Sequence, residues 1–246
     1  MDRRSVLSLW VRRTAGAGLA LGLPNLAWPQ AFSLTEARGA LRAALSQAAA
    51  VAVAQLGRPE GFLSNDKVRL GLPDALEKAS PVLRTIGQGD KLEAFTNALN
   101  VAAAELAAAA GPALNQAIAR AALPEPLKLL QGHQHALTVA FSEGQRAALT
   151  DTLRPVAQAV VDRSDLGSLH AELNDKAKST STSTSTSTST STSASDSTAA
   201  PVRVQAHLLQ KTLDGLFFVM GEEERRLRNA PAKSGSPLIR KVFGAL

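Results

Sequence analysis

The chain has 246 residues, which is enough to bury a sizeable core. It is rich in Ala and Leu, has no Tyr and has only 4% aromatic residues, and this composition favours helices over strands. Half of its net charge of +6 lies in the first thirteen residues, and acids and bases alternate elsewhere, which argues against a basic stripe and predicts no nucleic-acid partner. The absence of Cys excludes disulfides, thiolate catalysis, Cys-ligated metals and an N-terminal lipid anchor on Cys.

Residues 1–31 have the pattern of an export signal, with a basic start, an apolar run from Ala15 to Leu23 and an exit segment that ends at Ala31. The apolar run is too short and too rich in Gly to span a membrane, which takes about 20 residues. The pair Arg3-Arg4 resembles the twin-arginine pattern, and an ordinary secretory signal fits these residues equally well. We therefore expect an exported, periplasmic protein with no transmembrane span after signal removal.

The first mature helix is predicted by Ser33-Leu34-Thr35-Glu36, a capping box, and it ends at Gly57. Residues 57–72 contain turn formers together with apolar residues such as Phe62, and this mixture predicts a loop that lies on the core. The expected buried face of the helix follows from the helical spacing of its apolar residues Leu34, Leu41, Leu45, Ala48, Ala52 and Leu56.

Two further helices follow the loop. Pro73 predicts a helix that runs to about Ile86, with a kink or a break at Pro81. Asp90 is a good N-cap residue and predicts a long helix to Ala110. Its expected apolar face consists of Leu92, Phe95, Leu99, Ala102, Ala103 and Leu106.

Shorter segments come next. Gly111-Pro112 begins another helix, and Leu127–Leu130 forms a short one. Residues 135–163 supply one or two more helices, with Gly144 or Pro155 as the break between them.

Residues 179–193 are a strict alternation of Ser and Thr. Both faces of such a strand would be polar, so burial gains nothing, and we expect a disordered loop over 178–200; an O-glycosylated stalk is the alternative. Residues 202–228 then predict a helix with two favourable ion pairs, Glu222 to Arg226 and Glu224 to Arg228. Its apolar face consists of Leu209, Leu213, Leu216, Phe217, Met220 and Leu227, and a final turn that docks on the core contains Leu238, Ile239, Val242 and Phe243.

Together these segments predict an all-α fold, a single compact domain of about six to eight helices. The domain covers residues 32–246 and is interrupted by the disordered low-complexity loop 178–200. The segments on either side of that loop are expected to share one core.

Several clusters resemble functional motifs and are better explained otherwise. His133-Gln134-His135 lacks a third ligand and predicts a surface pair rather than a zinc site, while His170 and His207 read as partly buried or exposed helix residues. Gly87-Gln88-Gly89-Asp90 lacks the Lys and the strand of a phosphate loop and predicts a helix connector. Glu222-Glu223-Glu224 predicts surface ion pairs, because adjacent helical residues do not face one cleft.

No nucleophile elbow, H-E-x-x-H motif or P-loop occurs in the sequence, which favours a protein that is not an enzyme and needs no cofactor or metal. The candidate contact residues are instead polar residues within apolar patterns. An inward-facing Asn100 must find hydrogen-bond partners, as a structural contact or a ligand contact. Arg58, beside Phe62, is suited to helix C-terminal carbonyls or to an acidic ligand group. The full set of candidates is Arg58, Phe62, Asn97, Asn100, Lys211, Asp214 and Glu223.

Five short segments, read together, resemble a bacterial family of exported proteins, the domain-of-unknown-function family 4197. They are Leu56–Leu63, Gly87–Gly89, Lys211–Phe217, Glu222–Glu224 and Leu238–Gly244. The resemblance implies a helical, periplasmic domain and supplies no catalytic residues. Many members look like lipoproteins and have a Gly-rich stretch where this chain has the Ser/Thr run, and the lack of Cys departs from the lipoprotein pattern.

The function that fits these observations is non-catalytic binding of an apolar or amphipathic ligand, such as a lipid, or of a protein partner, in the cell envelope between Ala-rich helices. One alternative is a hydrolase that uses Asp214 or Glu223 with Arg58, which requires these groups to meet in one pocket. The other is a purely structural interaction module.

Overall fold

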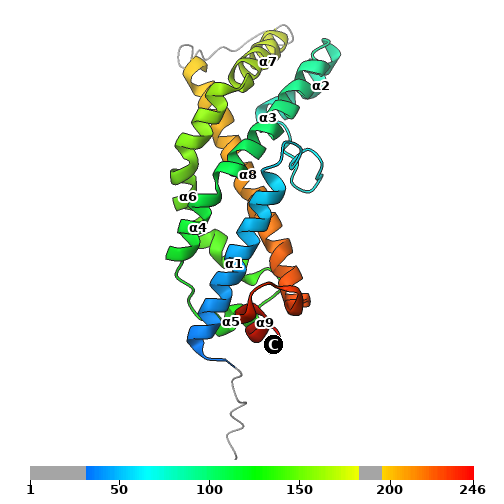
Figure 1. Cartoon of the computed structure of the whole chain (residues 1–246). Coiled ribbons are helices and arrows are strands. Elements are labelled where there is room, and N and C mark those ends of the chain that lie inside the picture. The colour runs from blue at the N-terminus through cyan, green and yellow to red at the C-terminus, as the bar shows by residue number, and fades with distance from the viewer. Residues whose placement is uncertain (1–31, 183–195) are drawn as a thin grey trace, which may run out of the picture. The chain divides into compact units, whose positions relative to one another are not determined.

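The computed structural model describes residues 32–182 and 196–246, and Ala31–Leu246 forms one compact unit. No residue in the described ranges lies in a strand, which confirms the all-α prediction (Figure 1). The predicted export signal and the Ser/Thr residues 183–193 lie outside the described residues. The elements are α1 (Leu34–Leu56), α2 (Asp74–Thr85), α3 (Gly89–Ala109), α4 (Gly111–Arg120), α5 (Pro126–Gln131), α6 (Ala136–Arg163), α7 (Leu166–Thr182), α8 (Asp196–Asn229), a 3-10 turn η1 (Pro231–Lys233) and α9 (Pro237–Phe243).

Helix α1 begins as the capping box predicts. The Glu36 amide donates to Ser33 Oγ over 3.2 Å, and the Ser33 amide donates to the Glu36 carboxylate over 2.8 Å. Lys241 of α9 donates to the same carboxylate over 2.6 Å. The hydrogen bond from Lys241, followed by those from Ser33, lowers the pKa of Glu36 to about 2. The start of α1 is thus tied to the C-terminal helix.

Helices α1 and α8 lie at the centre of the domain and run in opposite directions (Figure 1). Helix α8 packs on α6, α1, α3 and α7, and α1 also packs on α4, α5 and α9. The predicted apolar faces of α3 and α8 are buried throughout, and so is that of α1 apart from Leu34. Leu34 is 50% exposed because it is the first residue of α1, ahead of the first buried position, Ala37.

Alanines fill the contacts of α1 with its neighbours. Because an Ala side chain is short, helices that meet through it approach closely and leave little space between them. The buried alanines of α1, all at most 2% exposed, are Ala37, Ala40, Ala44, Ala48, Ala49 and Ala52.

Neither Pro81 nor Pro155 breaks its helix, and of the one or two helices predicted over residues 135–163 the structure has one. Helix α2 continues through Pro81, and α6 is one helix of 28 residues that continues through Gly144 and Pro155. Residues are buried on both sides of each proline, for example Leu153 and Ala157 around Pro155, and α6 packs along α8. Tertiary packing on both sides outweighs the one backbone hydrogen bond that each proline removes.

Two predicted boundaries are also corrected. Asp90 is not the N-cap of α3, because the helix begins at Gly89 and its N-cap is Gln88, which makes no side-chain cap; Asp90 lies in the first turn instead. Helix α7 extends to Thr182 and α8 begins at Asp196, so both helices enter the predicted loop 178–200. The predicted loop 57–72, the short helix α5 and the docking of α9 are confirmed.

None of the helices in the described ranges has the length and hydropathy that a membrane span requires.

Candidate functional site

The loop between α1 and α2, residues 57–72, is anchored at two points. The Phe62 ring is fully buried against Gly215 of α8, where an added Cβ would lie 2.7 Å from the ring. Further on, Leu70 exchanges two backbone hydrogen bonds with the Asn100 side chain, of 2.8 and 3.0 Å, and Asn100 also donates to the Thr96 carbonyl. Asn100 is therefore the structural contact that was one of its two predicted roles, and Phe62 is a core anchor.

Just before the first of these anchors, the loop crosses the end of α1 very closely. A Cβ at Gly61 would lie 2.4 Å from the Leu56 carbonyl oxygen, so only glycine fits there. The next residues are fixed by backbone hydrogen bonds, including the Ser64 amide to the Glu60 carbonyl over 2.9 Å. The loop therefore presents its polar side chains from a rigid backbone.

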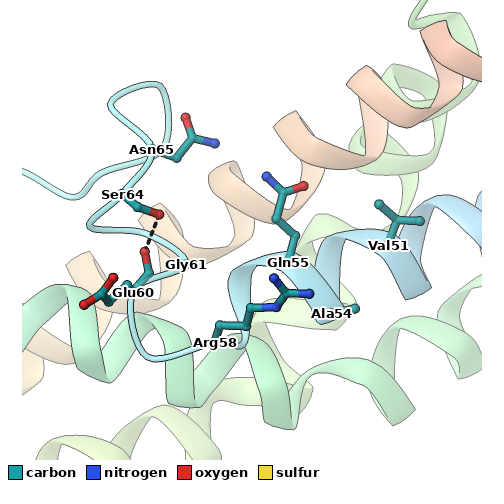
Figure 2. A pocket seen from close by; sticks show the side chains of 8 residues that line it. All are labelled: Val51, Ala54, Gln55, Arg58, Glu60, Gly61, Ser64 and Asn65. Atoms are coloured by element: carbon teal, nitrogen blue, oxygen red, sulfur yellow. Dashed lines mark hydrogen bonds between the residues drawn. The ribbon is translucent and has the colours of Figure 1, made fainter.

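A hollow of about 800 Å³ opens beside this crossing (Figure 2). We call it the Arg58 hollow. Among the described residues, none accepts a hydrogen bond from the exposed Arg58 guanidinium. Figure 2 shows Arg58 pointing back along α1 toward Ala54, whereas the Glu60 carboxylate points away from it. The hollow is lined by Val51, Ala54, Gln55, Arg58, Glu60, Gly61, Ser64 and Asn65.

A second hollow, of about 430 Å³, adjoins the first and lies between α1 and α8. Val51 and Gln55 line both, so the two hollows adjoin along α1, and we call the pair of them the α1 groove. The second hollow contains two ion pairs, Glu222 with Arg225 and Glu223 with Arg226. It is lined by Val51, Gln55, Val219, Glu222, Glu223, Arg225, Arg226, Asn229 and Ala230.

Glu223 is buried in the wall of this second hollow. It accepts hydrogen bonds from Gln47 of α1 over 2.9 Å and from two nitrogens of Arg226 over 2.6 Å, and Ser234 donates to Gln47 over 3.0 Å. The hydrogen bonds to Glu223, and then its charge, raise the pKa of Arg226. This chain of contacts joins α1, α8 and the connector after α8.

Glu224 is also buried, and it acts outside the groove. It accepts hydrogen bonds from the amides of Leu137 and Thr138 in the first turn of α6, over 3.1 and 2.8 Å. Its partner Arg228 donates to the carbonyls of Leu129 and Leu130 in α5. The pair caps the helix ends on either side of the α5–α6 connection.

The predicted ion pairs of this segment are thus partly corrected. Glu224 pairs with Arg228 as predicted, whereas Glu222 pairs with Arg225 rather than Arg226. Two of the three glutamates are buried instead of lying on the surface, because α6 covers Glu224 and α1 covers Glu223.

Of the groups of the hydrolase alternative, Arg58 and Glu223 line different hollows of the α1 groove, and Asp214 lines neither of them. Asp214 is exposed and pairs with Arg146 over 2.7 Å, and the Arg146 guanidinium lies over the Phe217 ring. Glu223 lines the second hollow, and Arg58 lines the first.

The other polar candidates lie elsewhere. Lys211 is exposed on α8, and Asn97 is exposed on α3, where it lines a separate hollow.

The histidines have structural surroundings. His135 is half-buried, with Nδ1 2.9 Å from the Gly221 carbonyl oxygen, while its neighbour His133 is exposed. His170, predicted to be partly buried or exposed, is buried beside the Phe95 ring. His207 lies 3.1 Å from the Gly71 carbonyl oxygen, and burial lowers its pKa. In the described ranges, no three His, Cys, Asp or Glu residues are grouped closely enough to hold a metal ion.

Sequence reasoning identified Arg58 and Glu223 and missed the other groove residues. Gln55 and Val51 are polar and apolar positions on the outward side of α1, and no local signal separates them from ordinary surface residues. Gln47 is bonded to a residue 176 positions away, which only the fold brings close.

Comparison with known proteins identifies a matching family model. No curated protein and no solved structure matches the chain. Residues 31–244 match the model of a family described as protein of unknown function, DUF4197. The match spans most of the chain and agrees with the resemblance of the five short segments. The chain belongs to the DUF4197 family.

Proposed function

We propose that this chain is a non-catalytic binding protein of the cell envelope, and that the α1 groove is its binding site. The observation that carries the proposal is that two hollows adjoin along α1 and share Val51 and Gln55 as lining residues. Surface grooves with an apolar floor and a few fixed polar groups are typical of ligand and peptide sites.

The lining of the groove suits an amphipathic ligand or a segment of a partner protein. Val51 and Ala54 offer apolar surface, and Gln55 and Asn65 offer amide groups for hydrogen bonds. Arg58 adds a cation that no described side chain neutralises. The rigid loop and the buried contacts of Glu223 hold both ends of the groove in place, which reduces the entropy cost of binding.

The contacts of the acidic residues support binding over hydrolysis. A catalytic carboxylate needs access to a substrate, whereas Glu223 and Asp214 are each held in an ion pair with an arginine. Neither carboxylate lines the hollow that contains Arg58.

The envelope location rests on residues 1–31, whose charge and apolar pattern is that of an export signal. Cell fractionation with a C-terminal tag tests it, and a periplasmic tag is expected. The variant Arg3→Lys/Arg4→Lys separates the two export routes, since it blocks the twin-arginine route and leaves the general secretory route active. A tag found only in the cytoplasm for the wild-type chain would refute export.

Native mass spectrometry of the protein purified gently from its own envelope tests the binding function. We expect a reproducible additional mass on the wild-type protein. The variant Ala54→Trp fills the Arg58 hollow and should remove that mass, whereas Ala50→Trp, an exposed α1 position one turn earlier that lines neither hollow, should retain it. A bare monomer would refute the proposal, and a bare dimer would favour the purely structural interaction module.

A further inference from the structure

A third hollow lies apart from the α1 groove and shares no lining residue with it. Its volume is about 420 Å³. Three segments meet there: the end of the loop 57–72, the last turn of α2 and the outer face of α3. The hollow is lined by Arg69, Arg84, Glu93, Thr96 and Asn97.

The charges in this hollow are unbalanced, with two guanidinium groups against one carboxylate. Arg84 and Glu93 are 3.9 Å apart, the outer limit of an ion pair, and both side chains are more than half exposed. A pair this long and this exposed holds its partners weakly. Among the described residues, none pairs with Arg69.

The backbone positions around the hollow are nevertheless fixed. The Arg69 amide donates to the Asn65 carbonyl over 2.9 Å, and the next residue, Leu70, is bound on both sides by Asn100. Asn97 lies one turn before Asn100 on the same helix. The contact that holds the loop to α3 therefore also sets Arg69 opposite Asn97.

We propose that Arg69, Arg84 and Asn97 form a binding site for a phosphate group. Each guanidinium presents a planar fork of donors that matches two oxygens of such an oxyanion, and the Asn97 amide adds another donor. Glu93 competes with the anion for Arg84. The volume of about 420 Å³ exceeds that of a phosphate group alone, so the phosphate is either free or the exposed end of a larger molecule such as a phospholipid.

The test is a titration of the full-length chain with inorganic phosphate at constant ionic strength, followed by two-dimensional ¹H–¹⁵N NMR. Saturable shifts are expected for the Nε–H groups of Arg69 and Arg84 and for the Asn97 side-chain amide. Arg69→Gln and Arg84→Gln should each weaken binding about tenfold or more, since each removes a charge-assisted contact. Glu93→Gln should strengthen binding, because it frees Arg84.

Arg38→Gln is the matched control, an exposed arginine on α1 that does not line the hollow, and it should leave binding unchanged. Circular dichroism checks that each variant is folded, as the exposure of both arginines leads us to expect. Sedimentation with phosphatidylglycerol vesicles, and with phosphatidylcholine vesicles of the same size, distinguishes the two sources of phosphate.

Shifts with inorganic phosphate that the two arginine variants weaken would support a site for the free anion. Phosphatidylglycerol-dependent sedimentation that the same variants abolish, without binding of inorganic phosphate, would support a lipid headgroup as the source. Binding that survives in Arg69→Gln and Arg84→Gln, or no binding to either probe, would overturn the proposal. None of these readouts involves the α1 groove, so the result is independent of the proposed function.

Discussion

Buried charged residues on α8 hold helix ends that come from distant parts of the chain. Glu224 caps α6, and Arg228 caps α5, and every side-chain nitrogen and oxygen of the pair takes part in a hydrogen bond. Such a pair stabilises the fold only as a unit, because each charge compensates the burial of the other.

We predict that Glu224→Gln lowers the free energy of unfolding by about 3–5 kcal/mol, since it leaves the buried Arg228 without its counter-charge. Urea denaturation measures the change. The matched control is Glu222→Gln two residues earlier, whose pair with Arg225 is partly exposed and should matter by about 1 kcal/mol or less. Equal losses in the two variants would contradict the capping role of Glu224.

Gly215 marks a close approach that a single methyl group disrupts. We predict that Gly215→Ala destabilises the protein by about 1–3 kcal/mol, because its Cβ would press on the buried Phe62 ring. Gly144→Ala in α6 is the contrasting control: nothing lies near the added Cβ, and alanine should stabilise the helix by about 0.5–1 kcal/mol. Thermal unfolding of both variants checks the opposite signs, and a stabilised Gly215→Ala would refute the tight contact.

At the scale of helices, local sequence signals predicted the structure correctly where neighbouring residues alone determine it. The capping box at Ser33 and the turn at Gly87, whose φ of 77° favours glycine, need no distant partner. Pro155 and Gly144 failed as break signals because α8 packs along α6 and keeps it continuous. Helix α7 went unassigned because polar residues obscure the spacing of Leu166, Leu169 and Leu173.

The continuity of α6 leads to a prediction about its proline. Pro155 cannot donate a backbone hydrogen bond and leaves the Asp151 carbonyl without its helical partner. We predict that Pro155→Ala raises the free energy of unfolding by about 1–3 kcal/mol, measured by urea denaturation. Pro237→Ala is the control, since proline is favoured at the first position of α9, and it should give no gain. A loss of stability in Pro155→Ala would mean that the proline shapes α6 to fit α8.

At the scale of the whole domain, the candidate site depends on contacts that no short segment encodes. Arg58 and Glu223 are recognisable as unusual polar positions, but their separation into two adjoining hollows follows from the packing of α1 on α8. Likewise, Arg69 lies beside Asn97 because Asn100 holds the loop to α3, and Arg84 joins them because α2 packs on α3. Sequence patterns can therefore suggest such residues, and the fold decides which of them meet.

Long-range packing also holds α9, the last helix of the domain, in place. Helix α9 covers the first turns of α1: Leu238 lies so close to Gly39 that a Cβ there would be 2.8 Å from it, and Lys241 bonds Glu36. Ile239, Val242 and Phe243 are buried, and each contributes roughly 1.5–3 kcal/mol. Their sum is comparable to the whole stability of a typical domain, roughly 5–15 kcal/mol.

We therefore predict that a protein without Pro237–Leu246 is no longer stably folded at room temperature. Its circular dichroism melt should show no cooperative unfolding transition. Hydrogen exchange should show the first turns of α1 losing protection first, because they lose the partner that covers them. Removal of Ala245–Leu246 alone is the control, since both residues are exposed and their loss should leave the melt unchanged. An unchanged melt for the longer deletion would mean that α9 does not contribute to the stability of the core.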